Sequence, residues 1–190
     1  MPVLVVCRAN VARSPLAEVM LADALAPLGV EVSSAGIQAV TGSPPARGSV
    51  ELAAERGLDL TAHRSRPVTP ELLAGADLVL TMSENQRDTC SRLVAGAGRY
   101  TFTLRELDRL AAHADTPARP PGGVPPGAAG TAGLIEAAHL ARPAARPPRG
   151  REDIPDPIGL DWEHWLTLAE ELDDVVARLA ARLRAAPRPD

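Results

Sequence analysis

Short apolar runs alternate with stretches of helical periodicity along most of this chain. Four runs rich in leucine, β-branched or aromatic residues predict strands, at residues 3–6, 30–33, 78–81 and 99–103. Between them, apolar residues that recur every three to four positions predict helices over residues 15–28, about 46–56 and 84–94. Strands that alternate with helices in this way favour the α/β class, in which helices cover both faces of a parallel sheet.

The C-terminal part of the chain adds two predicted helices. Thr103 and Glu106 have the spacing of a helix cap, and we expect a helix from there to about residue 112. A longer helix follows, whose apolar positions are Trp165, Leu168, Leu172, Val175, Val176, Leu179 and Leu183. We expect it to pack on the sheet, which gives a single doubly wound domain of 190 residues with four parallel strands.

Composition excludes several classes of function. The net charge is −4, all 20 basic residues are Arg, and no basic run suggests a nucleic-acid partner. No apolar stretch has the length of a membrane span, and a strand that begins three residues into the chain leaves no room for a signal peptide. The two cysteines, Cys7 and Cys90, do not resemble a disulfide framework. We therefore expect a protein of the reducing cytoplasm.

Candidate chemistry gathers in the eight residues from Cys7 to Ser14. Cys7 follows the first predicted strand, and a short loop leads to a helix whose first turn carries Ser14. A helix N-terminus offers free N–H groups and a positive dipole end, which favours both a bound phosphate and the thiolate form of a cysteine. Arg13 adds a planar guanidinium that can hold two phosphate oxygens. These residues predict a nucleophile and an anion site at the carboxyl edge of the sheet.

The same residues resemble a known family. The motif Cys7-x5-Arg13-Ser14-Pro15-x-Ala17-Glu18 and the distant pair Asp156-Pro157 are similar to the two signatures of the low-molecular-weight protein-tyrosine phosphatases. Further segments follow the family's order, namely Ser34-Ala35-Gly36, Gly57-Leu58-Asp59-Leu60-x-x-His63-Arg64 and residues 77–82. The resemblance covers nearly the whole chain apart from residues 113–151, and it implies the strand order 2-1-3-4.

The resemblance implies a role for each site residue, and it implies no cofactor and no metal. Cys7 would attack phosphorus and form a phosphocysteine, while Asp156 would protonate the leaving oxygen and then activate water, so activity should favour mildly acidic pH. Asn10, which can adopt left-handed dihedrals, would hold the loop through Ser34 and His63. Phosphate would be bound by Arg13 and by the loop residues Arg8, Ala9, Asn10, Val11, Ala12 and Ser14.

The pocket departs from the family pattern at several positions. Tyrosine phosphatases of this family flank the phosphate site with aromatic rings, whereas Ile158 follows Asp156-Pro157 here and the pair Val40-Thr41 precedes the loop glycine, Gly42. Ala12 stands where members often carry a cysteine, so oxidised Cys7 lacks that disulfide partner. Arg8 replaces a smaller or apolar residue, and it either favours acidic substrates or is a solvated charge.

Several functions are compatible with these residues. The leading hypothesis is a phosphomonoesterase that hydrolyses phosphotyrosine-type esters of a phosphorylated protein or of a small molecule. A phosphoarginine phosphatase is a close variant, although such members resemble this loop with Thr at the position of Val11. An arsenate reductase of this fold would need two further cysteines, whereas only Cys90 remains, and we interpret Cys90 as structural. A non-catalytic phosphate-binding module is the last alternative, against which the complete set Cys7, Arg13 and Asp156 argues.

Residues 113–151 differ from the rest in composition. They hold eight of the 19 prolines and many Gly and Ala residues, so no helix or strand can run through Pro117, Pro120 or Pro125. Residues 134–142 are the stretch that could form a short helix. We interpret the segment as an insertion, either a mobile loop or a lid or docking loop. Because it runs directly into Asp156, we expect it to border the active site.

Overall fold

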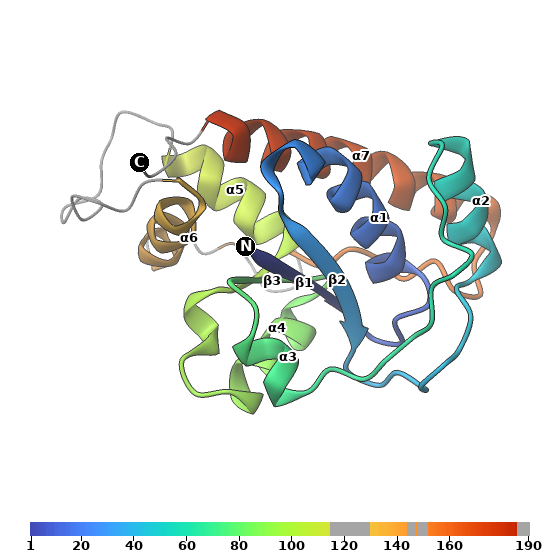
Figure 1. Ribbon diagram of the computed structural model, residues 1–190, viewed down its shortest axis with the longest axis horizontal. Helices are drawn as coiled ribbons and strands as arrows, with labels where there is room; N and C mark the ends of the chain where they lie inside the picture. The colour runs from blue at the N-terminus through green and yellow to red at the C-terminus, as the bar shows by residue number, and fades with distance from the viewer. Residues whose placement is uncertain (115–129, 144–146, 148–151, 186–190) are drawn as a thin grey trace.

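A parallel β-sheet forms the centre of the molecule (Figure 1). The computed structural model describes residues 1–114, 130–143, 147 and 152–185, and within them the sheet has four strands in the order β2-β1-β3-β4. The strands are β1 (Pro2–Cys7), β2 (Glu31–Gly36), β3 (Leu78–Thr81) and β4 (Thr101–Thr103), and all neighbours pair in parallel. This confirms the predicted fold class and the strand order that the resemblance implied.

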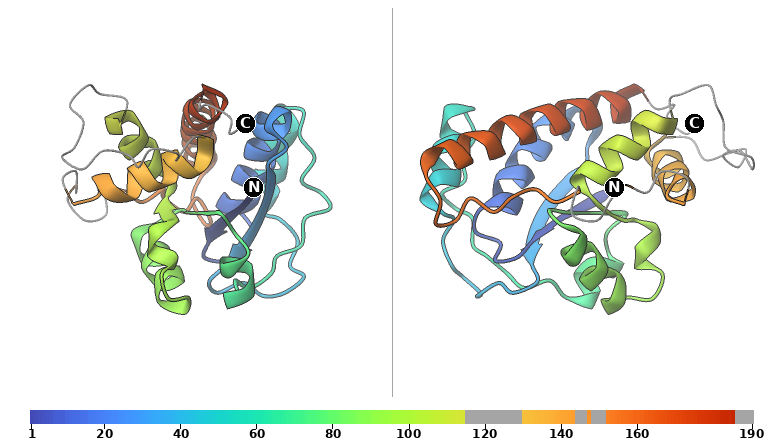
Figure 2. Two further views of the ribbon diagram at one scale, coloured as in Figure 1. Left: turned by 60° about the vertical axis from the view of Figure 1, so that its left-hand side comes forward. Right: turned by 180° about the vertical axis from the view of Figure 1, so that it is seen from behind.

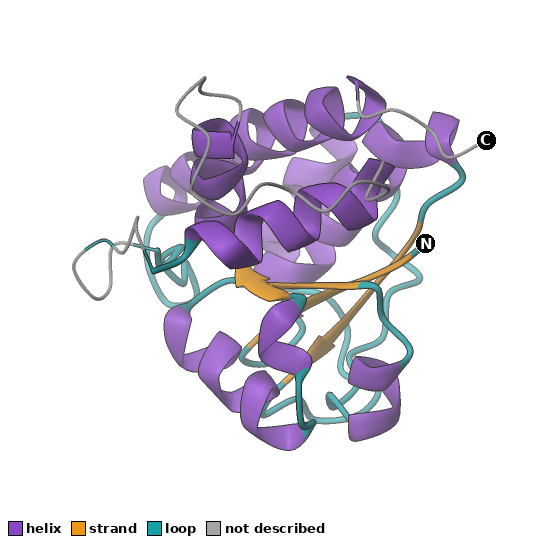
Figure 3. Cartoon of the chain, turned by 90° about the vertical axis from the view of Figure 1, so that its left-hand side faces the viewer, coloured by secondary structure: helices purple, strands orange, loops and turns teal. Residues whose placement is uncertain are grey.

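Helices cover both faces of the sheet, as its residue pattern requires (Figure 3). Along β1, Val3, Val5 and Cys7 belong to one buried cluster, whereas Leu4 and Val6 belong to another, so both faces of this strand are apolar. The first face is covered by α1 (Arg13–Leu25), α2 (Arg47–Glu55), α5 (Leu104–Ala114) and α7 (Trp162–Ala185). The second is covered by α3 (Pro70–Ala74) and α4 (Glu84–Leu93).

Helix α7 is the long amphipathic helix that the sequence predicted. It packs across α1, α2 and α5 and closes the core cluster that also contains the side chains of β1 (Figure 2). Trp165 is buried against α2, where a Cβ atom on Gly48 would come within 2.6 Å of the indole ring. Trp162, at the start of the helix, is 39% exposed. The apolar face of α7 therefore holds the part of the chain that follows Asp156 against the core.

Helix α6 (Gly130–Ala141) is the described part of the Pro-rich segment, and it begins four residues before the predicted helix. It packs on α5, and Arg142 lies over the ring of Phe102 in β4, 4.0 Å from the ring centroid. Arg142 Nε also donates to Glu106 Oε1 at 2.9 Å. Helix α6 therefore lies beside α5, as Figure 1 shows, and Arg142 directly after it contacts the edge strand. Pro117, Pro120 and Pro125 lie outside the described residues.

A few element boundaries differ from the sequence predictions. Strand β4 is shorter than expected because a 3₁₀ turn, η2 (Ala97–Arg99), takes its first residue, and α1 gives way to a second such turn, η1 (Ala26–Leu28), that contains Pro27. Helix α3 was not predicted, although Thr69 caps it by accepting a hydrogen bond from the Leu72 N–H at 3.3 Å. Among the described helices, none is long and apolar enough to cross a membrane.

Candidate active site

Cys7 is the last residue of β1 and is buried at the carboxyl edge of the sheet. Two groups donate hydrogen bonds to its Sγ atom, the Asn10 N–H at 3.2 Å and the Ser14 hydroxyl at 3.0 Å. Helix α1 begins at Arg13, and no side chain caps its N-terminus. The Ser14 hydroxyl therefore binds the sulfur of Cys7 and does not cap the helix. Both donors stabilise negative charge on Cys7, as a thiolate nucleophile requires.

Asn10 organises the loop between Cys7 and α1. Its φ of 56° is the left-handed conformation expected from the sequence. Its side-chain amide donates to Ser14 Oγ at 3.0 Å and to Ser34 Oγ at 2.7 Å. The backbone carbonyl oxygen of Asn10 lies 2.9 Å from His63 Nε2. A carbonyl only accepts, so His63 is the donor there. The structure thus brings Asn10, Ser34 and His63 together as the resemblance implied.

Glu18 completes this hydrogen-bond chain, and the sequence analysis assigned it no role. The Ser34 hydroxyl donates to Glu18 Oε2, and His63 Nδ1 lies 3.8 Å from the same oxygen. Ser34 and Ser14 each accept from the Asn10 amide and donate onward, to Glu18 and to Cys7 respectively. The sequence spacing could have predicted that Glu18 faces the site, because it lies one helical turn after Ser14 and therefore on the same side of α1.

Neighbouring segments hold the loop in place from outside. Gly36 leaves no room for a side chain, since a Cβ atom there would lie 2.7 Å from the Arg8 carbonyl oxygen and 2.9 Å from the Asn10 nitrogen. The Ala46 N–H donates to the Val11 carbonyl at 2.7 Å, and the Ser49 hydroxyl donates to the Ala12 carbonyl at 3.0 Å. The loop is therefore clamped by β2 on one side and by the start of α2 on the other.

Arg13 and Asp156 meet across 143 residues of sequence. Arg13 is 6% exposed, forms an ion pair with Asp156 through Nη2 and donates from Nη1 to the Ile154 carbonyl at 2.9 Å. Its Nε is buried without a hydrogen-bond partner among the described residues, and a phosphate oxygen is the kind of acceptor that would satisfy it. Asp153 and Asp161 are held elsewhere, by the Glu84 N–H and by His164, which distinguishes Asp156 as the carboxylate of this site.

The comparisons with known proteins agree with this geometry. The family model of the low molecular weight phosphotyrosine protein phosphatases matches residues 2–119. The chain belongs to this family. Its members named in the comparisons are phosphatases, so the protein is a hydrolase of the same kind.

Three relatives illustrate the range of similarity. The probable low molecular weight protein-tyrosine-phosphatase EpsP of Ralstonia solanacearum is 44% identical over 108 residues, which cover 57% of this chain and 73% of that protein. A protein-arginine-phosphatase of Geobacillus stearothermophilus is 29% identical over 182 residues, 96% of this chain and 95% of its own length. The crystal structure of a low molecular weight protein tyrosine phosphatase from T. tengcongensis superposes with a TM-score of 0.71 at 27% identity, covering 96% and 99% of the two chains.

The remaining positions of the family's loop differ in exposure. Ala12 is buried, whereas Ala9 and Val11 are half-buried. Arg8 is exposed, and its Nε donates to the Gln38 side-chain oxygen at 2.8 Å, so its guanidinium lies against the segment after β2. The aliphatic side chains that replace the family's aromatic rings are exposed as well, Val40 at 73% and Ile158 at 50%.

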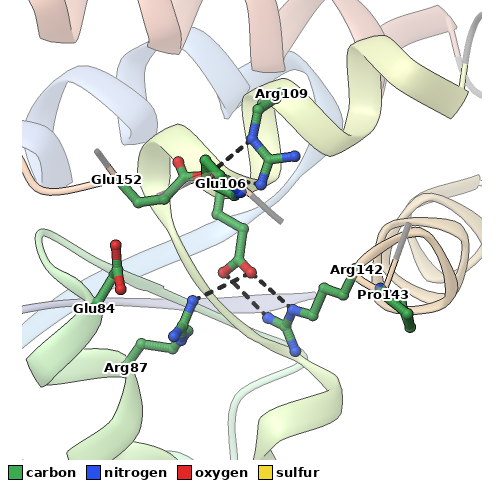
Figure 4. Close-up of a pocket in the computed structure, with 8 residues that line it drawn as sticks. Glu84, Arg87, Glu106, Arg109, Arg142, Pro143 and Glu152 are labelled. Atoms are coloured by element: carbon green, nitrogen blue, oxygen red, sulfur yellow. Dashed lines mark hydrogen bonds and ion pairs between the residues drawn. The ribbon is translucent and has the colours of Figure 1, made fainter. Parts of the chain in front are cut away.

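A separate pocket of about 450 Å³ lies among α4, α5 and α6 (Figure 4). None of its lining residues comes from the Cys7 loop, and most are charged: Glu84, Arg87, Glu106, Arg109, Arg142 and Glu152, with Pro143 and Pro147. Glu106 faces both Arg87 and Arg142, while Glu152 faces Arg109. Within the described ranges, no group of three or more His, Cys, Asp or Glu side chains is arranged to hold a metal ion.

Proposed function

We propose that this phosphatase hydrolyses phosphotyrosine-type esters through a phosphocysteine intermediate on Cys7. The observation that carries the proposal is the meeting of Cys7, with its two hydrogen-bond donors, and the Arg13–Asp156 pair at one end of the sheet. The proposal treats residues 1–190 as one phosphatase domain that works in the reducing cytoplasm on phosphorylated protein or a small phosphomonoester.

In the first step, the Cys7 thiolate forms a bond to phosphorus while the bond from phosphorus to the ester oxygen breaks. The three remaining phosphate oxygens would be held by the guanidinium of Arg13 and by the N–H groups of the loop from Arg8 to Ser14. Because Arg13 is paired with Asp156, phosphate competes with this carboxylate and frees it to face the leaving group. In mild acid the released carboxylate takes up a proton from solvent, and it then gives this proton to the departing oxygen.

In the second step, water hydrolyses the phosphocysteine. Asp156, now ionised, accepts a proton from water as the water oxygen attacks phosphorus and the sulfur leaves as thiolate. The hydroxyl of Ser14 and the N–H of Asn10 stabilise the departing sulfur, because both donate to Sγ. One carboxyl group therefore serves both steps, and the enzyme returns to its starting protonation state.

Phosphoarginine is the second candidate substrate. Two observations favour it. The first is the long alignment with a protein named protein-arginine-phosphatase. The second is that Val40 and Ile158, which are exposed and aliphatic, offer no aromatic ring on which the ring of phosphotyrosine could stack. Val11 argues for the ester, because the arginine-type loop resembles this one with Thr at that position. An arsenate reductase relay is disfavoured by Cys90, which lies in the core cluster on the other face of the sheet.

The test is hydrolysis of p-nitrophenyl phosphate between pH 4.5 and 8, without a thiol reductant, by the wild type and four variants. We expect activity in mild acid, no turnover above background for Cys7→Ser, and a fall of about 10²- to 10⁴-fold for Asp156→Ala. The matched controls Cys90→Ser and Asp161→Ala should retain activity. A wild-type protein that binds vanadate without turnover would instead be a binding module, and one that needs thiol coupling would be a reductase.

Substrate class is decided by two peptides of the same sequence, one carrying phosphotyrosine and the other phosphoarginine. We expect the larger kcat/KM for phosphotyrosine. Val11→Thr should shift the ratio of the two kcat/KM values toward phosphoarginine. A wild-type preference for phosphoarginine would replace the leading candidate by the second one while leaving the cysteine mechanism in place.

A further inference from the structure

The segment that carries Asp156 has no regular secondary structure, yet two of the residues just before Asp156 are buried. Residues 153–157 are neither helix nor strand, while Glu152 is 5% exposed and Ile154 only 1%. The Asp156 side chain is 39% exposed, and its hydrogen bonds to the described residues are with Arg13 and with the Ile158 N–H at 3.3 Å. When a bound phosphate replaces Asp156 as the partner of Arg13, the position of the Asp156 carboxyl group depends mainly on the contacts that hold residues 152–154.

Two arginines of α5, one helical turn apart, bind the residues that precede Asp156. Arg109 donates from Nε to Glu152 Oε1 at 2.8 Å, and its Nη2 forms an ion pair with the same oxygen at 2.7 Å (Figure 4). The Glu152 side chain is 6% exposed, so its carboxylate depends on Arg109 rather than on water, whereas the Arg109 side chain is 34% exposed. Arg105 donates from Nη1 to the Asp153 carbonyl oxygen and forms an ion pair with Glu171 of α7.

The backbone of the same segment is tied to the sheet. The Ile154 N–H donates to the Met82 carbonyl at 2.8 Å, directly after β3, and Asp153 Oδ1 accepts from the Glu84 N–H at the start of α4, also at 2.8 Å. These bonds fix the segment from the side of β3 and α4. Arg105 and Arg109 fix it from the side of α5, so the segment is held between two layers of the fold.

We infer that Arg105 and Arg109 are positioning residues for Asp156, acting through Asp153 and Glu152. The inference rests on the proposed role of Asp156 as general acid. Proton donation requires the carboxyl group within hydrogen-bond reach of the leaving oxygen, and a displacement of about 1 Å can cost about 100-fold in rate. Among the described residues, the contacts of Arg105 and Arg109 are with Asp153, Glu152 and Glu171 and not with the Cys7 loop. Their loss should therefore act through Asp156, on proton donation to the leaving group and on the activation of water, and only the first of these depends on the ester.

A leaving-group comparison isolates that step. Phenolate is a strongly basic leaving group, since a phenol such as Tyr has a pKa of about 10, whereas the nitro group makes p-nitrophenolate a far weaker base. A misplaced acid should therefore slow phenyl phosphate more than p-nitrophenyl phosphate. We expect Arg109→Gln to lower kcat/KM for phenyl phosphate about tenfold more than kcat/KM for p-nitrophenyl phosphate, and Arg105→Gln to act in the same direction. The ratio kcat/KM reports phosphoryl transfer to Cys7, whereas hydrolysis of the phosphocysteine is common to both esters.

The matched control is Asp108→Asn, on the same helix. Asp108 pairs with Arg178 and Arg182 of α7, so its loss removes ion pairs from α5 without touching residues 152–156. A purely structural role for the arginines predicts equal losses with both esters in all variants, and that result would overturn the inference. If Arg109→Gln does not fold, Arg109→Lys provides the test, because it keeps the charge but not the two-nitrogen geometry.

Failure of this inference is distinguishable from failure of the proposed function. Asp156→Ala should show the strongest dependence on the leaving group of all the variants. If Asp156→Ala steepens the dependence and the arginine variants do not, Asp156 is the acid and α5 does not position it. If Asp156→Ala leaves the dependence unchanged, the role of Asp156 is wrong and the inference falls with it.

Discussion

Cys7 and Cys90 are both buried thiols, yet their surroundings differ in every respect that matters for reactivity. Cys7 ends a strand beside a helix N-terminus and receives hydrogen bonds from the Asn10 N–H and the Ser14 hydroxyl. Cys90 lies on α4 in the cluster with Leu4 and Val6, and this burial raises the pKa of its thiol to about 11. Burial by itself therefore disfavours the thiolate, and donors aimed at the sulfur are what make a buried cysteine usable as a nucleophile.

The largest expected difference between the two thiols is their rate of alkylation. With a pKa of about 11, only about three in ten thousand Cys90 side chains are thiolate at pH 7.5. Iodoacetate is also an anion, which the Arg13 site favours. We expect peptide mass spectrometry to find Cys7 alkylated at least about 10³-fold faster than Cys90, with Cys90 reacting faster as pH rises toward 11. Comparable rates in the folded protein would contradict this contrast.

Removing a donor from Cys7 should produce the next largest effect. Ser14→Ala deletes the hydroxyl that donates to Sγ, and we expect kcat for p-nitrophenyl phosphate to fall about tenfold. The control is Thr89→Val beside Cys90, whose hydroxyl donates to the Asn85 carbonyl and accepts from Arg92, both on its own helix. That variant should keep kcat within about twofold. Equal losses in the two variants would mean that the hydroxyls matter for folding and not for the sulfur.

A separate effect, on stability rather than on rate, is expected at alkaline pH. The pKa of Cys90 is higher in the folded protein than the value of about 8.5 for a free thiol, so the folded state keeps a proton that the unfolded state loses. This contribution is fully present below about pH 8.5 and is lost as pH rises toward 11, at a cost of about 3 kcal/mol. Urea unfolding of wild type and Cys90→Ala at pH 7.5 and 10.5 should show this loss in the wild type only. A parallel loss in both proteins would remove Cys90 from the explanation.

The local parts of the structure were predictable from the sequence because short-range rules determine them. The Val-rich run that ends at Cys7, the left-handed Asn10 and the apolar face of α7 all follow from residue type and spacing. The order of the strands leaves no such local pattern, and only the resemblance to the family implied it. Helix α3 was missed because it is only five residues long, although Thr69 and Pro70 mark its start.

The contacts that complete the site could not be read from the sequence. Arg13 meets Asp156 across 143 residues, and Arg105 reaches the Asp153 carbonyl across 48, so neither pairing leaves a local pattern. Glu18 of α1 was visible in the motif, but its partner Ser34 lies on strand β2. The expectation that the Pro-rich segment borders the active site was drawn from chain order, whereas its described helix packs on α5. Most of the segment lies outside the described residues, so its position relative to Asp156 stays a prediction.

The most direct measurement is identification of the covalent intermediate. Wild-type protein mixed with p-nitrophenyl phosphate, quenched in acid within one turnover and digested, should carry one phosphoryl group on the peptide that contains Cys7. Asp156→Asn, which cannot activate water, should accumulate more of this adduct. Turnover by the wild type without any adduct on Cys7, or with the phosphoryl group on another residue, would contradict the mechanism.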